Sequence, residues 1–192
     1  GDWRLAASAG GGSLEQTSTR TLTTLGLVGQ AHSTGSFAGV AARADYHWNW
    51  VNHVYLSPYL DASYLTSHYG SAQESGAGPL DIHYGGLSQQ LTRWSVGVRL
   101  GMVVEEAHST LSPWLQVGEI GYSGDRNPIE MQSIGGQSFA VAGSALPGSA
   151  LGASAGLDWQ GHGPWRFKLA WFGSFASNYH DNGGTALLQY VW

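Results

Sequence analysis

Apolar and polar residues alternate along most of the chain. Between residues 38 and 48 the even positions are apolar and end in Tyr46 and Trp48, whereas the odd positions include Arg43 and Asp45. The same period of two recurs in residues 56–65, 87–101, 151–159, 165–171 and 186–192. A period of two is typical of strands with one apolar face, and the helical period of 3.6 fits none of these segments. The pattern predicts an all-β, antiparallel fold.

The alternating segments delimit nine predicted strands, and a short tenth strand or a hairpin is possible at residues 137–143. The nine segments are residues 2–10, 18–29, 37–48, 54–66, 87–103, 111–121, 150–160, 164–174 and 185–192.

The two faces of these strands favour a transmembrane β-barrel, whose strands need about 9 to 11 residues. In lipid every backbone donor must be paired, so such a sheet must close. A soluble β-sandwich or lipocalin-like barrel also alternates, but it carries more charge on its outer face. We predict a polar lumen lined by Arg43, Asp45, Asp61, Arg93, Arg99, Asp158, Arg166 and Lys168. We predict a lipid-facing row that includes Val96, Val98, Leu100, Leu157, Phe167 and Leu169.

Aromatic residues lie mainly at the ends of the apolar rows, where amphipathic rings favour the headgroup boundary. The predicted aromatic girdle comprises Trp48, Trp50, Trp94, Trp159 and Trp165.

The amino-acid composition excludes several further classes of protein. Charged residues make up 11% of the 192 residues, and Lys168 is the only lysine. The net charge of -5 provides no basic surface for nucleic acid. Cysteine is absent, which excludes disulfides and thiolate metal sites. No apolar run is long enough for a membrane-spanning helix. We expect a single domain over residues 1–192.

The order of several segments resembles the C-terminal translocator domain of autotransporters, the type V secretion proteins of Gram-negative bacteria. The matching segments are LSPYLDASYL (56–65), QESGAG (73–78), LTRWSVGVRLG (91–101), LSPWLQVGEIGY (111–122) and QSFAVAGSALPGSALGASAGLDW (137–159), followed by a terminal aromatic residue.

The resemblance implies a twelve-stranded barrel in the bacterial outer membrane, of which this chain carries the C-terminal nine or ten strands and lacks the first ones. It implies export of an N-terminal passenger that lies outside this chain, without a cofactor. It also implies three partners: outer-membrane lipid, the passenger and the barrel-assembly machinery, which reads a C-terminal signal that includes Tyr190 and Trp192.

Membrane topology follows from loop length, since periplasmic turns are short and outer loops are longer. With Trp192 in the periplasm, residues 49–53, 104–110 and 161–163 become periplasmic turns. The longer segments 67–86, 122–149 and 175–184 then lie outside, and a count of nine strands places Gly1 on the outer side. On these faces we expect Val98→Arg to destabilise the barrel by about 2 to 4 kcal/mol, and Ser95→Arg to cost much less.

Two alternatives remain: a soluble β-rich binding module, and an outer-membrane hydrolase with an active site at the rim. The rim groups for the hydrolase are His68, Glu74, His83, Asp125, Glu130, His180 and Asp181. A Gly-x-Ser-x-Gly match at Gly152, Ser154 and Gly156 lacks the strand-turn-helix context of a nucleophile elbow. The eight histidines show no metal-ligand spacing, although they could meet in space. We therefore expect no catalytic residue and no metal site.

Overall fold

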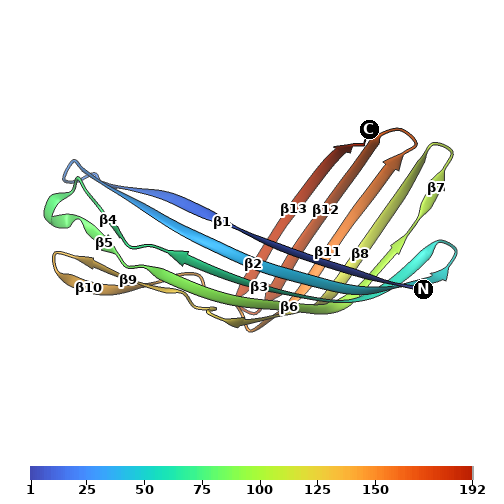
Figure 1. Cartoon of the computed structure of the whole chain (residues 1–192), viewed down its shortest axis with the longest axis horizontal. Helices are drawn as coiled ribbons and strands as arrows, with labels where there is room; N and C mark the ends of the chain where they lie inside the picture. Colours follow the sequence, from blue (N-terminus) through green and yellow to red (C-terminus); the bar gives the residue numbers. More distant parts are fainter. Residues whose placement is uncertain (192) are drawn as a thin grey trace.

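One long-stranded antiparallel sheet dominates the computed structural model, which describes residues 1–191 (Figure 1). Neighbours in the sheet follow chain order, and each adjacent pair is antiparallel. The strands are β1 (Asp2–Leu22), β2 (Leu27–Val51), β3 (Val54–Tyr69), β6 (Leu87–Met102), β8 (Ser109–Gly124), β11 (Ser149–Gly161), β12 (Trp165–Ala176) and β13 (Tyr179–Tyr190).

A ninth member of the sheet, β7 (Val104–Glu106), continues β6 rather than adding a row. Gly101 pairs with Trp114 and Val104 pairs with Leu111, so the register is unchanged across the break. The main sheet, called the wall below, therefore has eight strands side by side in the described residues, and not the nine predicted. The predicted strand at residues 18–29 is wrong. A turn at residues 23–26, with Gly26 at φ 65°, divides that segment between β1 and β2.

The number of strands also decides at which end of the sheet the N-terminus lies. Eight rows bring Gly1 to the same end of the sheet as the end of β13, and Figure 1 shows both termini at that end. The prediction that Gly1 lies on the outer side is therefore wrong. Three short turns share this end, at residues 52–53, 107–108 and 162–164. Asn52 and His53 both have positive φ, as the two-residue turns that match the twist of a hairpin require.

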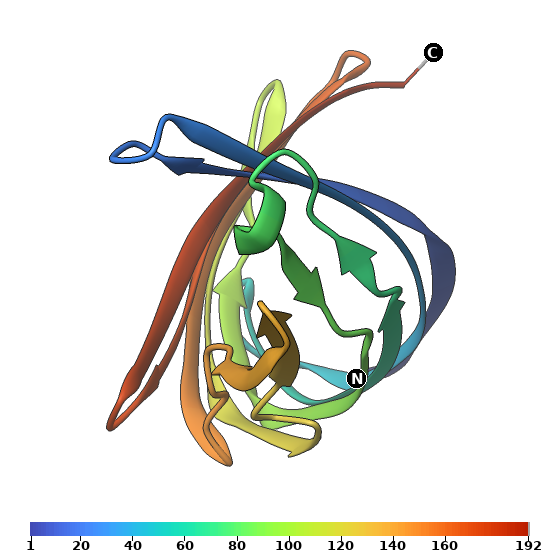
Figure 2. The same ribbon diagram turned by 90° about the vertical axis from the view of Figure 1, so that its left-hand side faces the viewer.

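The opposite end carries a second, smaller sheet in the order β10-β9-β5-β4. Its strands are β4 (Ala72–Gln73), β5 (Ile82–Tyr84), β9 (Ile129–Ile134) and β10 (Gln137–Ala142), with the 3-10 helix η1 (Gly78–Leu80) between β4 and β5. Both long connections contribute strands. β9 and β10 pair as a hairpin, which is one of the two alternatives predicted for residues 137–143. Figure 2 shows this sheet inside the curve of the main sheet, which forms a half-barrel.

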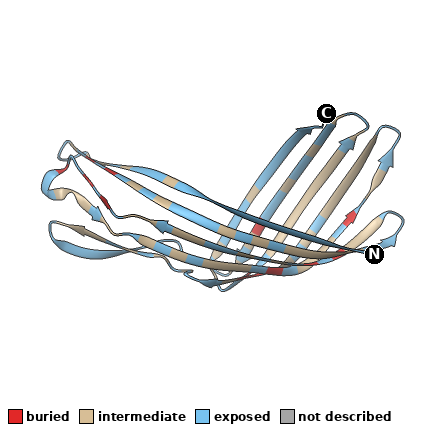
Figure 3. Ribbon diagram, in the orientation of Figure 1, coloured by how far each residue is buried: buried red, intermediate tan, exposed pale blue. Residues whose placement is uncertain are grey.

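Buried residues are few and scattered over the wall (Figure 3). Register places Ser57 and Tyr59 of β3 on the same face as Ser95 of β6 and Ile120 of β8, and these four are buried. We call this the inner face, because the small sheet packs over it. Large apolar residues on the outer face are exposed, including Val40, Leu60, Val96, Leu115, Leu151 and Leu169.

This distribution is the reverse of a water-soluble β-sandwich, which buries its apolar rows in a core. Within residues 1–191, no helix is both long and apolar enough to cross a membrane.

Candidate functional site: the inner face of the half-barrel

A ladder of ion pairs crosses the middle of the inner face. Strand order brings Arg43 of β2 opposite Asp61 of β3, and Asp61 opposite Ser95 of β6. Arg93 Nη1 donates to Asp61 Oδ1 at 2.7 Å, and Arg43 Nε donates to Asp45 Oδ2 at 3.4 Å. Because side chains alternate along a strand, register places all eight predicted lumen residues on this face.

Gln116 of β8 also belongs to this ladder, although nothing in its sequence context drew attention to it. Its Oε1 accepts hydrogen bonds from Arg99 Nε at 3.1 Å and from Arg43 Nη2 at 3.3 Å. One neutral amide thus fixes two guanidinium groups from β2 and β6. An inward position opposite Arg99 is the signal that could have found it, but only once the pairing of β6 with β8 is known.

Aromatic rings hold the same two arginines from the side. The Arg43 guanidinium lies 4.4 Å from the Tyr59 ring centre, and that of Arg99 lies 4.3 Å from the Trp114 ring centre. Such cation–π contacts add about 0.5 to 2 kcal/mol each, more when they are desolvated. The cationic groups are therefore held against the wall and do not project freely into the enclosed space.

Tyr59 also makes contacts at one of the most buried positions of the wall. Its hydroxyl lies 3.2 Å from Ser95 Oγ and also beside Gly97 and Gly118, where a side chain would collide with it. Ser95 is only 2% exposed. The burial of Ser95 therefore argues against the expectation that an arginine there would cost much less than one at Val98.

The charges thin out toward β12 and β13. Lys168 Nζ lies 4.0 Å from Asp158 Oδ1, and both side chains are well exposed. Arg166 lies near the turn between β11 and β12, beside an open hollow that His162 also lines. An exposed pair at this distance contributes about 0 to 1 kcal/mol, so this part of the ladder adds polarity more than stability.

The outer face carries the residues predicted to meet lipid. Register places Val96, Val98 and Leu100 outward on β6, and Leu157, Phe167 and Leu169 outward on β11 and β12. The same parity places Trp48, Trp94, Trp159 and Trp165 of the predicted girdle outward. Trp50 lies at the register shift between Asn49 and Val51, where parity does not assign a face. From Trp94 to Met102 is nine residues, which matches one crossing of a bilayer. Glu119 of β8 is exposed on this face. It pairs with Val96, which lies two residues from Trp94 along β6.

The C-terminal signal lies partly within the described chain. Tyr190 pairs with Trp165, and their ring centres are 5.0 Å apart on the outer face. Trp192 lies outside the described residues.

Residues 70–86, which connect β3 to β6, are fastened to the β1–β2 hairpin through Glu74. Arg20 Nε donates to Glu74 Oε1 at 3.0 Å, and the Ile82 amide and the Tyr84 hydroxyl donate to the same carboxylate at 3.0 Å each. Glu74 is 2% exposed, and the Arg20 hydrogen bond, helped by those from Ile82 and Tyr84, lowers its pKa to about 2. Backbone hydrogen bonds between Gln30 and Ser75 complete the attachment.

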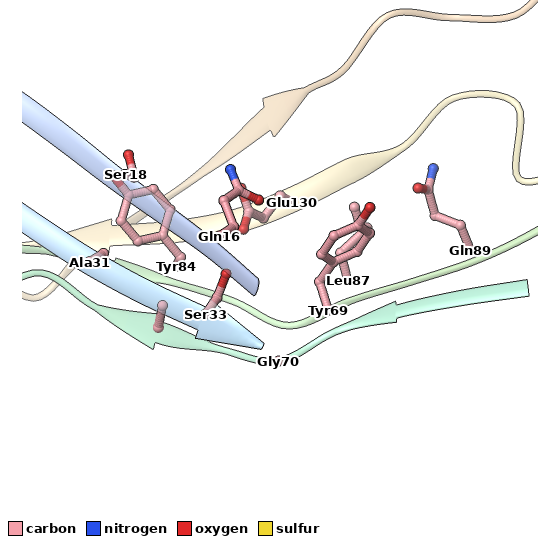
Figure 4. Close-up of a pocket in the computed structure, with 11 residues that line it drawn as sticks. Gln16, Ser18, Ala31, Ser33, Tyr69, Gly70, Tyr84, Leu87, Gln89 and Glu130 are labelled. Carbon is pink, nitrogen blue, oxygen red and sulfur yellow. The ribbon is translucent and has the colours of Figure 1, made fainter. Parts of the chain in front are cut away.

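Beside this attachment lies a cavity of about 340 Å³ (Figure 4). The wall contributes Gln16, Ser33 and Gln89, and the small sheet contributes Tyr84 and Glu130. The cavity is thus a gap of mixed polar and apolar lining between the inner face and the small sheet that covers it.

The predicted rim groups lie on several different elements. His68 Nδ1 lies 2.8 Å from Ser88 Oγ on the outer face, whereas Glu130 lines the inner cavity. His83 lies on β5, His180 and Asp181 lie on β13, and Asp125 accepts the Gln90 amide. The Gly152-Ser154-Gly156 match lies inside β11, where no elbow can form. Among residues 1–191 no group of three or more potential ligands is placed to hold a metal ion.

Comparison with known proteins agrees with this geometry. A model of the family described as "Autotransporter beta-domain" matches residues 1–188. No curated protein matches the chain. With an inward-polar, outward-apolar half-barrel and a family match over nearly its whole length, the chain belongs to the autotransporter beta-domain family, the outer-membrane translocators of Gram-negative bacteria.

Proposed function

We propose that the inner face is the wall of the export pore and that its paired charges keep the pore polar without trapping a chain in transit. The lining residues are Arg43, Asp45, Asp61, Arg93, Arg99, Asp158, Arg166 and Lys168. The observation that carries the proposal is the ladder Arg93–Asp61 and Arg43–Asp45, with Gln116 bridging Arg43 to Arg99.

Pairing suits this task for an electrostatic reason. An uncompensated charge in a confined, partly dehydrated space costs several kcal/mol, and it binds any opposite charge that passes. A guanidinium already bonded to a carboxylate or amide, and packed on an aromatic ring, offers few donors to a passing segment. The wall is thus hydrophilic enough to admit an extended polypeptide and weakly retentive.

The partners follow from the two faces. The outer face, with Val96, Val98, Leu100, Leu157, Phe167 and Leu169, contacts outer-membrane lipid, and the tryptophan girdle sits at its boundaries. Strands that pair with the outer edges of β1 and β13 close the sheet, because lipid leaves no backbone group unpaired. A passenger outside this chain uses the pore, and the barrel-assembly machinery reads the end that contains Tyr190 and Trp192. Residues 1–192 act as one domain, and export involves no catalysis.

The test is export of a reporter. The domain is expressed with a protease-sensitive reporter as passenger, and the fraction of reporter that external protease cleaves on intact cells measures translocation. Folded barrel is measured in parallel by its faster migration on a gel before boiling. We expect both signals from the parent protein.

Two paired-charge variants make the test specific. Asp61→Asn leaves Arg93 without its carboxylate and should slow export while folded barrel persists, whereas the double variant Asp61→Asn/Arg93→Gln should recover export. The lining proposal fails if the single and double variants export equally, and the translocator assignment fails if folded parent barrel exports no reporter.

A further inference from the structure

Two of the three short turns at one end of the wall bring histidines together. His108 lies in the turn before β8, and His162 lies in the turn between β11 and β12. Because β8 pairs with β11 as far as Ser109 and Gly161, the two turns leave the sheet side by side. The His162 amide donates to the His108 carbonyl at 3.0 Å, which fixes the two backbones relative to each other.

The two imidazole rings extend from these fixed backbones and lie edge to face. Their centres are 6.0 Å apart, with an angle of 80° between the ring planes. Two imidazoles on one tetrahedral zinc ion, each with a Zn–N bond of about 2.0 Å, have ring centres roughly 5 Å apart. The difference is about one ångström, which a change in side-chain rotation covers without moving the backbone.

The surroundings leave room for such an ion. Both histidines are exposed, so water can complete the coordination. Glu105 and Glu106 precede His108 and make the local charge negative, while Arg166 lies on the inner side of the hollow that His162 lines. That hollow measures about 560 Å³ and is open to solvent.

We propose that His108 and His162 form a binding site for a divalent cation that prefers imidazole, such as Zn²⁺, Cu²⁺ or Ni²⁺. The bound ion joins the β8 turn to the β11–β12 turn and thereby restrains the seam between β8 and β11. The site depends on the register of this seam and is independent of whether the pore exports a passenger.

The experiment measures metal binding by the detergent-solubilised protein, purified with a tag that contains no histidine. Titration calorimetry with ZnCl2 gives the affinity, and electron paramagnetic resonance with CuCl2 counts the nitrogen ligands. We expect one Zn²⁺ site above the background of lipid phosphate, and Cu²⁺ spectra with two imidazole nitrogens. His108→Gln and His162→Gln should each bind at least about tenfold more weakly, a loss of about 1.4 kcal/mol, and leave one imidazole nitrogen.

The matched control is His53→Gln, in the third turn of the same end, between β2 and β3. It should bind Zn²⁺ as the parent does. Heat-modifiable migration shows whether each variant is folded, and should a Gln variant not fold, diethylpyrocarbonate modification of the folded parent replaces it and should abolish the same site. Equal affinity in all three variants, or a single imidazole nitrogen in the parent spectrum, overturns the proposal.

Discussion

Gly118 occupies a position where the wall has no room for a methyl group. A Cβ there would lie 2.5 Å from the Tyr59 hydroxyl and 2.6 Å from the Val96 carbonyl oxygen. Gly118→Ala should therefore lower the free energy of unfolding by about 1 to 3 kcal/mol, as overpacking generally does. Urea unfolding in detergent micelles measures this change.

Gly10 supplies the matched control, since it lies in β1 with no atom within 4 Å of a built Cβ. Gly10→Ala should leave stability unchanged or raise it slightly, because alanine restricts the unfolded chain. An equal loss in both variants would show that the strand glycines act through backbone freedom and not through Tyr59.

The carboxylate of Glu74 makes the attachment of residues 70–86 sensitive to acid. Its pKa in the folded protein is about 2, below the ordinary value of 4.5. A carboxyl whose pKa falls on folding stabilises the fold fully above its unfolded pKa, and that stabilisation, at most about 3 kcal/mol, disappears as the pH falls toward its folded pKa. We expect the protection of the amides of residues 70–86, measured against the intrinsic exchange rate at each pH, to fall between about pH 4.5 and 2.

Glu74→Gln should expose the same amides already at neutral pH and remove most of the acid response. Glu130→Gln is the control, because the Glu130 side chain bonds only to Gln132 among the described hydrogen bonds and does not fasten the segment. An acid-induced loss of protection that persists undiminished in Glu74→Gln would assign the response to another group.

A single strand can test the two faces of the wall. Leu169 points outward on β12 and its neighbour Ala170 points inward, beside Gly156 and Thr185 in register. Leu169→Arg should cost about 2 to 4 kcal/mol in a bilayer, whereas Ala170→Arg should cost much less. Refolding into lipid vesicles across a urea series gives both values, and equal losses would reject the face assignment. This pair replaces Ser95 as the inward control, since Ser95 is buried.

The length of a strand is less visible in the sequence than its faces. β1 runs from Asp2 through three consecutive glycines to Leu22, and the alternation predicted only its first nine residues, 2–10. Glycine carries no side chain to mark a face, so the pattern fades although the backbone continues to pair. The turn at 23–26 was missed because Thr and Leu on either side of it suit a strand as well.

The topology gives the sheet two ends, and we predict that they lie on opposite sides of the outer membrane. The turn at residues 23–26 lies at the end that carries the small sheet, and the turn at 162–164 lies at the other. The chain has no cysteine, so a single introduced thiol reports its own position. On intact cells a membrane-impermeant maleimide should label Thr24→Cys at once and Gly163→Cys only after the outer membrane is permeabilised. The reverse pattern would invert the assigned orientation.

Alternation along single strands was enough to predict the all-β class and which residues share a face, and the order of short segments carried the family resemblance that the match over residues 1–188 confirms. Each of these depends on neighbours along one strand, where side-chain direction follows from position alone.

How the strands meet became visible only in three dimensions: Gln116 bonds both Arg43 and Arg99, the Tyr59 hydroxyl lies beside Gly97 and Gly118, and the His108 ring lies against that of His162. The tertiary structure also joined two distant connections into one small sheet. These contacts depend on the register between strands, which backbone hydrogen bonding fixes across the sheet and which a local alternation of apolar and polar residues does not encode.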